Sequence, residues 1–369
     1  MNIVYDYNIF CLHEYGGISR YFNELATCLA NNKKDKVKVL SPLYINSYLK
    51  KNHNITIYGM NIYNFPYTRR LYCGINNMIS YFYSKIDSKT DIFHETYYNS
   101  INTCPMNAKH ILTIHDMIPE LFSAGNFDIK KSNKYHAVQK ADHIICVSEN
   151  TKKDLVKLFC VPATKISVVH HGNDFNFNAL LDSPVRIFDE PFILYVGKRD
   201  GYKNFKNFAY SFSLSSFLKN NFKIICFGGG DFTPEEISFI NMYDLTDNVK
   251  YMSGADKLLA QLYIDASALI YPSKYEGFGM PILEAMSYGC PVICSNTGSL
   301  PEVAGDAAEF FNPMDTLEMK GVIENVLMSE NKREELTLLG KVNILRFSWE
   351  KCARETRAVY SSVLNQVNI

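Results

Sequence analysis

The chain has 369 residues, of which 47% are hydrophobic and 21% are charged. This composition excludes a disordered chain, and the length predicts two packed domains rather than one hydrophobic core. Lysine plus arginine and aspartate plus glutamate balance at 38 each, so no overall positive field attracts nucleic acid, and we expect no nucleic-acid partner.

The N-terminus and the hydropathy of the chain predict a cytoplasmic protein. Residues 1–6 read as a strand rather than as a signal peptide. No apolar run approaches the roughly 18 to 20 residues of a membrane-spanning helix. Ten cysteines are scattered singly, without a Cys-x-x-Cys pair. We therefore expect free thiols, most of them buried, and no zinc site.

Two series of short, β-branched apolar runs alternate with helical stretches. The first series comprises residues 3–5, 37–40, 92–94, 111–114, 144–147 and 166–169. The second comprises residues 192–196, 223–227, 249–252, 268–271, 292–295 and 309–311. Such alternation is typical of parallel sheets covered by helices, so each half is predicted to be a Rossmann-like α/β domain.

The domain boundaries follow from composition. Residues 171–190 are polar and rich in turn-forming residues, which favours an interdomain linker. An amphipathic stretch from Phe347 to Leu364, with Ser348 as N-cap, predicts one closing helix. We therefore predict domains over 1–178 and 179–346, followed by a C-terminal helical segment over 347–369.

Two features of the first half point toward a ligand. Gly16 and Gly17 open a helical pattern after the first predicted strand, and glycines at such a turn let backbone N–H groups approach a phosphate. A plain turn explains the two glycines equally well. His115 directly follows the run 111–114, so its imidazole leaves the carboxyl end of a strand, although a structural histidine is the ordinary alternative. Metal-ligand spacings are absent from the sequence, and no metal is predicted.

In the second half, three cations follow the run 192–196: Lys198, Arg199 and Lys203. Ligands of open α/β sheets bind outside the carboxyl ends of the strands. A diphosphate there is held by charge-assisted hydrogen bonds of roughly 1.5 to 3 kcal/mol each. A solvated surface loop is the alternative. The position directly after a strand favours phosphate binding.

Glu276 and Glu284 flank the most informative segment of the chain. Gly277 and Gly279 keep the first glutamate on a loop, and Pro281 suits the first turn of the helix that follows. Two carboxylates and several unpaired backbone N–H groups would thus surround one helix N-terminus. A sugar nucleotide, anionic and rich in hydroxyls, fits such a site.

These motifs occur in a recognisable order. The matching segments are 254, 259–264, 266–268, 271–273, 275–279, 281–286, 289–292 and 299–303, with Gly16–Gly17, His115–Asp116, Val147–Ser148, Val196–Gly197, Lys203–Asn204 and 347–349 elsewhere. Together they resemble the retaining family 4 glycosyltransferases of GT-B fold over nearly the whole chain. The resemblance implies two Rossmann-like domains facing each other across a cleft, with the last helix crossing back onto the N-terminal domain.

The resemblance also implies roles. Glu276 would lie beside the donor sugar and Glu284 at the nucleotide ribose. The donor would further be lined by Phe278, Gly279, Met280 and Pro281, with Gly16 and Gly17 contacting the phosphate. His115 would lie near the reacting carbon. For the diphosphate, the bidentate geometry of arginine favours Arg199 with Lys203, while the family position of the first cation is Lys198, so the choice between Lys198 and Arg199 stays open.

The implied activity is the retaining transfer of a hexosyl residue from a nucleotide-diphosphate sugar, with mannose as the first candidate for that residue. GDP is the first candidate nucleotide and UDP the second. The acceptor is expected to be a saccharide or lipid-linked saccharide in bacterial polysaccharide, lipopolysaccharide or capsule synthesis. No cofactor and no metal are expected. A sugar-nucleotide 2-epimerase and a catalytically silent, transferase-like binding subunit are the alternatives.

Residues 57–86 are rich in aromatic side chains and include Arg69, Arg70 and Lys85. An aromatic and basic surface suits contact with lipid, so we expect peripheral association with the inner face of the cytoplasmic membrane. Ordinary core packing of these aromatics explains the pattern equally well.

Overall fold

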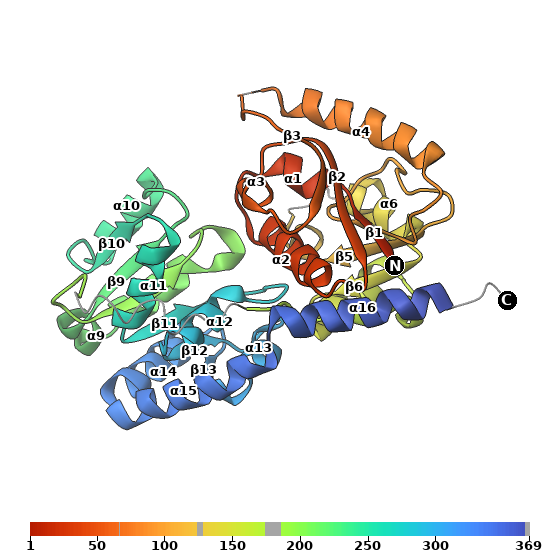
Figure 1. The fold of residues 1–369 in the computed structure, drawn as a ribbon. Coiled ribbons are helices and arrows are strands. Elements are labelled where there is room, and N and C mark those ends of the chain that lie inside the picture. Colours follow the sequence, from red (N-terminus) through yellow and green to blue (C-terminus); the bar gives the residue numbers. More distant parts are fainter. Residues whose placement is uncertain (66, 124–127, 174–185, 366–369) are drawn as a thin grey trace. The chain divides into compact units, whose positions relative to one another are not determined.

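A computed structural model describes residues 1–65, 67–123, 128–173 and 186–365. The chain forms two compact units (Figure 1). Unit 1 contains Met1–Gly172 and Trp349–Ile369, and unit 2 contains Asn173–Ser348. The boundary predicted between residues 178 and 179 lies outside the described residues. None of the described helices is long and apolar enough to cross a bilayer.

The described part of unit 1 contains a seven-stranded parallel sheet in the order β3-β2-β1-β4-β5-β6-β7. Its strands are β1 (Asn2–Tyr5), β2 (Lys36–Tyr44), β3 (Thr56–Asn61), β4 (Ile92–Glu95), β5 (Lys109–Ile114), β6 (His143–Cys146) and β7 (Ile166–Val168). Its helices are α1 (Asn8–Leu12), α2 (Gly17–Asn31), α3 (Ser47–Lys51), α4 (Arg69–Ile86), α5 (Ile118–Phe122), α6 (Asn133–Lys140), α7 (Glu149–Phe159) and α16 (Trp349–Asn365). The predicted parallel sheet is confirmed.

Strand β3 is an addition that the sequence did not predict. Its run of apolar residues is interrupted by Gly59, and most of its side chains are exposed. Gly59 has a φ of 152°, and a Cβ there would collide with the carbonyl of Ser41 on β2. The β2–β3 register shifts between Leu40 and Leu43, at this same close approach. Glycine is therefore required for β3 to pair with its neighbour.

The described part of unit 2 contains a six-stranded parallel sheet in the order β10-β9-β8-β11-β12-β13. Its strands are β8 (Phe192–Val196), β9 (Lys223–Phe227), β10 (Val249–Met252), β11 (Ala268–Tyr271), β12 (Val292–Ser295) and β13 (Ala308–Phe311). Its helices are α8 (Phe205–Ser213), α9 (Ser216–Asn221), α10 (Pro234–Met242), α11 (Asp256–Asp265), α12 (Met280–Ser287), α13 (Leu300–Ala304), α14 (Thr316–Met328) and α15 (Glu330–Asn343). Both predicted Rossmann-like halves are therefore present.

Helix α16 closes the core of unit 1, as expected for the last helix. It packs beside α2 (Figure 1). Its residues Trp349, Tyr360 and Val363 belong to the same buried cluster as Phe22 and Leu25 of α2. Burial of large apolar side chains at about 25 cal/mol per Å² makes this contact a main source of stability for the unit.

A buried polar chain ties α16 to the sheet. The Tyr360 hydroxyl lies 3.0 Å from that of Tyr5 on β1 and 2.6 Å from Nδ1 of His94 on β4. Nε2 of His94 lies 2.8 Å from the hydroxyl of Thr113 on β5. Burial lowers the pKa of His94 from its ordinary 6.5 to about 3, so the imidazole is neutral in the folded protein.

Acidification is expected to destabilise unit 1 through His94. Because the folded pKa lies below the unfolded one, stability is complete above pH 6.5 and is lost as the pH falls from 6.5 toward 3. The expected loss is about 1.4 kcal/mol per pH unit across that window. Urea unfolding at pH 7.5, 6.0 and 5.0 measures it. His94→Gln should reduce the slope, while buried His115 and His171, whose pKa values burial also lowers, maintain the remainder. His53→Gln, at an exposed position, should leave it unchanged; equal slopes in all three proteins would contradict the assignment.

Candidate functional site

The loop after β8 is fixed to the neighbouring strand β11. Asn204 adopts the left-handed conformation, with φ 62° and ψ 26°. Its side-chain amide donates to the carbonyls of Pro272 (3.1 Å) and Pro313 (2.8 Å). Because β8 and β11 are parallel neighbours, their carboxyl ends lie at the same edge of the sheet. Asn204 thereby holds Lys203 at this edge.

Lys203 and Glu276 form an ion pair at the edge. The Lys203 Nζ lies 2.7 Å from Oε1 of Glu276 and donates to the Tyr271 hydroxyl at 3.3 Å. Glu276 is buried, and its backbone carbonyl accepts from the hydroxyl of Ser299 at 2.9 Å. Burial, then the nearby Glu276 carboxylate, raises the pKa of Tyr271 well above 10. The arrangement holds one cation and one carboxylate ready for a polar ligand.

Helix α12 begins directly after this pair. Its N-cap, Gly279, has φ 97° and ψ 49°, and no side chain caps the helix start. A Cβ at Gly279 would come within 2.8 Å of Leu300, so no larger residue fits. Pro281 occupies the first turn, as predicted from the sequence. Backbone N–H groups at such a start favour an anion.

Glu284 lies one turn into α12. Its Oε2 accepts a hydrogen bond of 3.1 Å from the hydroxyl of Tyr263 on α11. Burial, then Glu284 itself, raises the pKa of Tyr263 well above 10, so the phenol remains a donor. Tyr263 and Tyr271 were not among the predicted site residues. Tyr263 orients the Glu284 carboxylate, and Tyr271 accepts a hydrogen bond from Lys203.

Arg199, which we preferred as a diphosphate contact, has other partners than Lys203 and Glu276. Its guanidinium Nε lies 2.9 Å from Oε1 of Glu236, and its other nitrogens donate to the carbonyls of Gly228 (3.0 Å), Gly230 (2.7 Å) and Asp231 (3.0 Å). The rings of Phe232 and Tyr251 lie 4.7 and 5.5 Å from its central carbon. The buried arginine therefore holds the loop after β9 rather than awaiting a diphosphate. The neighbouring Lys198 is exposed.

The loop that Arg199 holds consists of three consecutive glycines. Gly228, Gly229 and Gly230 have φ values of 80°, 77° and 85°. A Cβ at Gly229 would lie 2.6 Å from the carbonyl of Gly197, so the loops after β8 and β9 touch. This Gly-Gly-Gly run was not among the predicted site residues. Its position directly after a predicted strand is the sequence signal that could have identified it, because a glycine backbone can approach a ligand closely.

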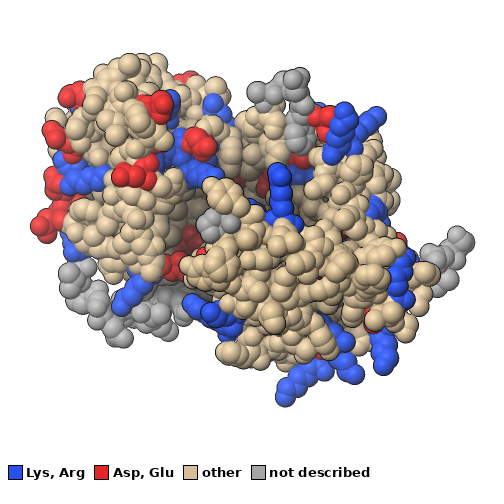
Figure 2. Space-filling view, turned by 90° about the horizontal axis from the view of Figure 1, so that it is seen from above, with Lys and Arg blue, Asp and Glu red and all other residues tan. Residues whose placement is uncertain are grey.

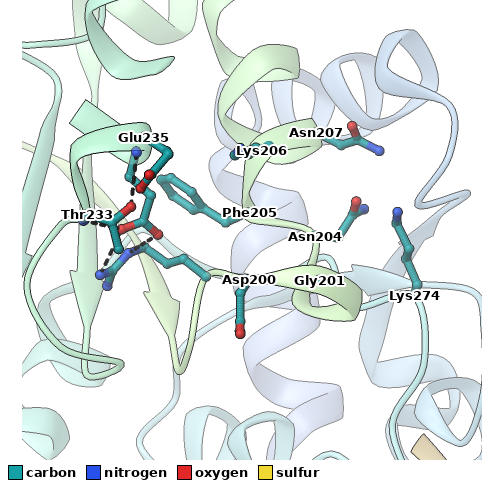
Figure 3. Close-up of a pocket in the computed structure, with 11 residues that line it drawn as sticks. Asp200, Gly201, Asn204, Phe205, Lys206, Asn207, Thr233, Glu235 and Lys274 are labelled. Carbon is teal, nitrogen blue, oxygen red and sulfur yellow. Dashed lines mark hydrogen bonds and ion pairs between the residues drawn. The ribbon is translucent and has the colours of Figure 1, made fainter. Parts of the chain in front are cut away.

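A pocket of about 450 Å³ lies next to these loops. Figure 3 shows Lys274 and the amides of Asn204 and Asn207 on one side, with Thr233 and Glu235 on the other. Lys203 and Glu276 do not line this pocket. The pocket, which Arg199 also lines, thus lies within unit 2 and does not contain the Lys203–Glu276 pair.

The other predicted residues belong to unit 1. Gly17 is the first residue of α2, and a Cβ there would meet no atom within 4 Å. No packing contact within the protein therefore requires a glycine at this position. His115 is buried, and neither ring nitrogen has a hydrogen-bond partner among the described residues. Burial lowers its pKa well below 6.5, so the ring is neutral.

The surroundings of His115 are aromatic. Ring centroids of Tyr21, Phe22 and His171 lie 5.1, 5.8 and 5.5 Å from it. Buried polar groups normally have a hydrogen-bond partner, and a buried group without one in a native structure needs an explanation. A neutral imidazole has one donor and one acceptor nitrogen. Both nitrogens of His115 therefore keep unused hydrogen-bonding capacity among the described residues.

The described residues contain no group of three or more His, Cys, Asp or Glu side chains arranged to hold a metal ion. Unit 2 brings together Lys203, Glu276 and the start of α12, and it orients Glu284 through Tyr263. Gly16, Gly17 and His115 are described within unit 1 alone.

Known proteins with similar sequences and folds fall into one class. The model of Glycosyltransferase Family 4 matches residues 15–177, and that of Glycosyl transferases group 1 matches residues 182–341. The O-antigen chain mannosyltransferase B of Escherichia coli is 28% identical over 266 residues, which are 68% of this chain and 69% of that protein. The serotype-specific mannosyltransferase WbdA of Escherichia coli is 28% identical over 280 residues, which are 70% of this chain but 34% of that longer protein.

Among solved structures, Anabaena Alr3699/HepE in complex with UDP and glucose has a TM-score of 0.76 at 16% identity. The match covers 98% of this chain and 100% of that one. At this identity the likeness concerns the fold, which is the GT-B fold expected from the sequence.

The different roles of Arg199 and Lys198 are testable by stability. Arg199→Ala removes the donors of three carbonyls and leaves the Glu236 carboxylate without its partner, so we expect a loss of about 3 kcal/mol in the free energy of unfolding. Lys198→Ala, at the exposed neighbouring position, should change it by less than about 0.5 kcal/mol. Urea denaturation monitored by circular dichroism measures both. Equal midpoints for the two variants would show that Arg199 is not a structural residue.

Proposed function

The chain belongs to the glycosyltransferases of family 4 and group 1, with GT-B fold, and from this premise we propose a retaining hexosyltransferase. It transfers a hexosyl residue, with mannose as the first candidate, from a nucleotide-diphosphate sugar to a saccharide or lipid-linked saccharide. The observation that carries the proposal is the Lys203–Glu276 ion pair at 2.7 Å, directly before the uncapped start of α12.

This geometry suits a donor with a diphosphate and a sugar. Lys203 and the positive end of α12 would hold the diphosphate, with Lys198 as an exposed cation on the same loop. Glu276, held by Lys203, would accept hydrogen bonds from sugar hydroxyls. Glu284, oriented by Tyr263, would do so from the ribose. The site stabilises charge by groups already in place, which is the largest contribution in many enzymes.

Transfer then needs no protein nucleophile. The bond between the anomeric carbon and the diphosphate oxygen breaks, and the acceptor oxygen bonds to the same face of that carbon. The acceptor proton passes to the departing phosphate oxygen. Lys203 and the helix start stabilise the negative charge that develops there, so the reaction is proposed to proceed without metal or cofactor. His115, buried and without a protein partner, would orient a substrate hydroxyl.

The similarity to O-antigen chain mannosyltransferase B supports mannose as the sugar. GDP remains our first candidate nucleotide. The UDP bound to the HepE structure makes UDP the second candidate. The acceptor is then a growing bacterial surface polysaccharide, free or lipid-linked. This part of the proposal depends on relatives rather than on a contact in the site.

Glu276 and Lys203 variants test the donor site. GDP-mannose at saturating concentration should raise the Tm of the parent by several degrees, as expected for about 2.7 kcal/mol of binding linkage at 100 times Kd. Lys203→Ala should lose most of this shift, and Glu276→Ala should lower mannose transfer to saccharide acceptors at least about 100-fold. Differential scanning fluorimetry and a radiolabelled transfer assay are the measurements.

Two surface variants serve as controls. Lys332→Ala removes a lysine paired with Glu309 on the surface, and Glu330→Gln changes an exposed glutamate of the same unit; both should behave as the parent. Unchanged transfer in Glu276→Ala would overturn the central assignment. Epimerised sugar nucleotide formed without acceptor would favour the 2-epimerase, and tight binding without turnover would favour the silent subunit.

Membrane contact is the second part of the proposal, and helix α4 supports it. The buried residues of α4 are Asn76, Ser80 and Ser84, spaced by four along one face. Many of its apolar residues are instead exposed: Leu71, Met78, Ile79, Tyr81, Phe82 and Ile86. The helix is thus turned with a polar side inward. Among its aromatics, Tyr83 packs against a buried cluster of unit 1, whereas Tyr81 and Phe82 are exposed.

The surroundings of α4 extend this apolar face. Strand β3 and the loop after it expose Tyr58, Met60, Tyr63, Phe65 and Tyr67. From Lys36 to Ile86 the sequence has seven lysines and arginines and no aspartate or glutamate. Figure 2 looks onto this side of unit 1, where the surface is mainly uncharged with blue residues around it. An apolar face with basic surroundings is complementary to anionic lipid.

Co-sedimentation with liposomes tests this face. The parent should bind vesicles containing phosphatidylglycerol, more weakly at high salt, because screening reduces the attraction of the basic residues. The double variant Met78→Ser and Phe82→Ser should reduce the bound fraction at least about five-fold. Leu338→Ser with Leu345→Ser, which removes two exposed leucines of unit 2, is the matched control. No binding of the parent to anionic vesicles would end this part of the proposal.

A further inference from the structure

Two cysteines far apart in sequence meet between α1 and α4. The Sγ of Cys11 lies 3.3 Å from the Sγ of Cys73. Cys11 is in α1 and Cys73 in the first half of α4. A disulfide has an S–S distance of about 2.05 Å, so a movement of roughly 1.2 Å joins the two sulfurs. We propose that Cys11 and Cys73 are a reversible oxidation site that forms a disulfide between α1 and α4.

The two thiols differ in accessibility. Cys11 is buried, and its sulfur also lies 3.6 Å from the carbonyl oxygen of Asn8. Cys73 is partly exposed, and Arg69 lies one helical turn before it. An oxidant therefore reaches the Cys73 sulfur first. Cys11 lies behind it, in the position of a resolving thiol.

The electrostatics agree with this order. The hydrogen bond from Cys11, then the charge of Arg69, lowers the pKa of Cys73 to about 7. The same hydrogen bond, together with burial, raises the pKa of Cys11. The thiolate is the reactive form of cysteine. At neutral pH the exposed member of the pair is therefore the nucleophile, and the buried member keeps its proton.

The oxidation balances with a peroxide as the oxidant. The Cys73 thiolate attacks one peroxide oxygen, the O–O bond breaks, and a sulfenic acid and water result once a proton is taken up. The Cys11 sulfur then attacks the Cys73 sulfur, loses its proton and releases a second water. Two thiols are oxidised to one disulfide, and one peroxide is reduced to two waters. A dithiol reductant reverses the step by exchange.

The crosslink would act on the helix that carries the apolar face. Without it, α4 is held mainly by polar contacts. Asn76 exchanges two hydrogen bonds of 2.8 Å with the backbone of Leu43, and Asn77 accepts from the hydroxyl of Tyr7 at 2.6 Å. Cys73 lies one turn before these asparagines. A disulfide adds a covalent bond to this contact and closes the intervening loop, which restricts the unfolded chain.

Mass spectrometry of the full-length protein tests the site. The reduced protein is treated with a small excess of hydrogen peroxide, denatured, alkylated and digested. We expect a loss of two hydrogens, two fewer alkylated thiols, and one crosslinked peptide pair that contains Cys11 and Cys73. The Tm of the oxidised protein should rise by several degrees and return to the original value with dithiothreitol.

Single variants make the outcome specific. Cys73→Ser and, separately, Cys11→Ala should abolish the crosslink and the change in Tm. Cys160→Ser removes an exposed cysteine and should leave both intact. A parent without the Cys11–Cys73 peptide after peroxide, or a crosslink that persists in Cys73→Ser, would overturn the proposal. The readout is a covalent bond, so it is independent of sugar transfer and of lipid binding.

Discussion

The site depends on one ion pair, Lys203 with Glu276. The lysine follows β8 and the glutamate follows β11, and these parallel neighbours end at the same edge of the sheet. Both side chains are largely buried, and removing a charge from water is unfavourable unless it is paired. Three residues hold the ion pair in place: Asn204, Tyr271 and Ser299. Each forms a hydrogen bond that fixes a backbone or side-chain position on which the geometry of the ion pair depends.

Neighbouring cations on the same loop have different roles because the chain turns between them. Lys198 remains in solvent, whereas Arg199 points inward to the carbonyls of the glycine loop and to Glu236. Three successive residues with positive φ are unfavourable for a free loop, since glycine loses the most conformational freedom on ordering. The buried Arg199, which lies beside two aromatic rings, compensates by donating hydrogen bonds to the carbonyls of this loop. The shape of the loop after β9 is thus maintained by a buried charge.

Most of the architecture could be predicted from the sequence, because buried parallel strands are continuous apolar runs. Strand β3 could not, since its exposed side chains and Gly59 interrupt the pattern. The structural role of Arg199 could not be predicted for a different reason: residue type indicates which bonds arginine can form, but its partners are about 30 or more positions away. Composition identified residues 57–86 as aromatic and basic without predicting α4 or which of its faces lies inward. That the ring nitrogens of His115 have no hydrogen-bond partner among the described residues follows only from packing.

The placement of α16 has a consequence for biosynthesis. Its Trp349, Tyr360 and Val363 complete the core of unit 1, and Tyr360 links to Tyr5 and His94 on two of the sheet's strands. These residues leave the ribosome only after all of unit 2 has been made. Unit 2 is continuous and can fold as soon as it emerges, whereas the unit begun first must wait for the end of the chain. The order of folding is then the reverse of the order of synthesis.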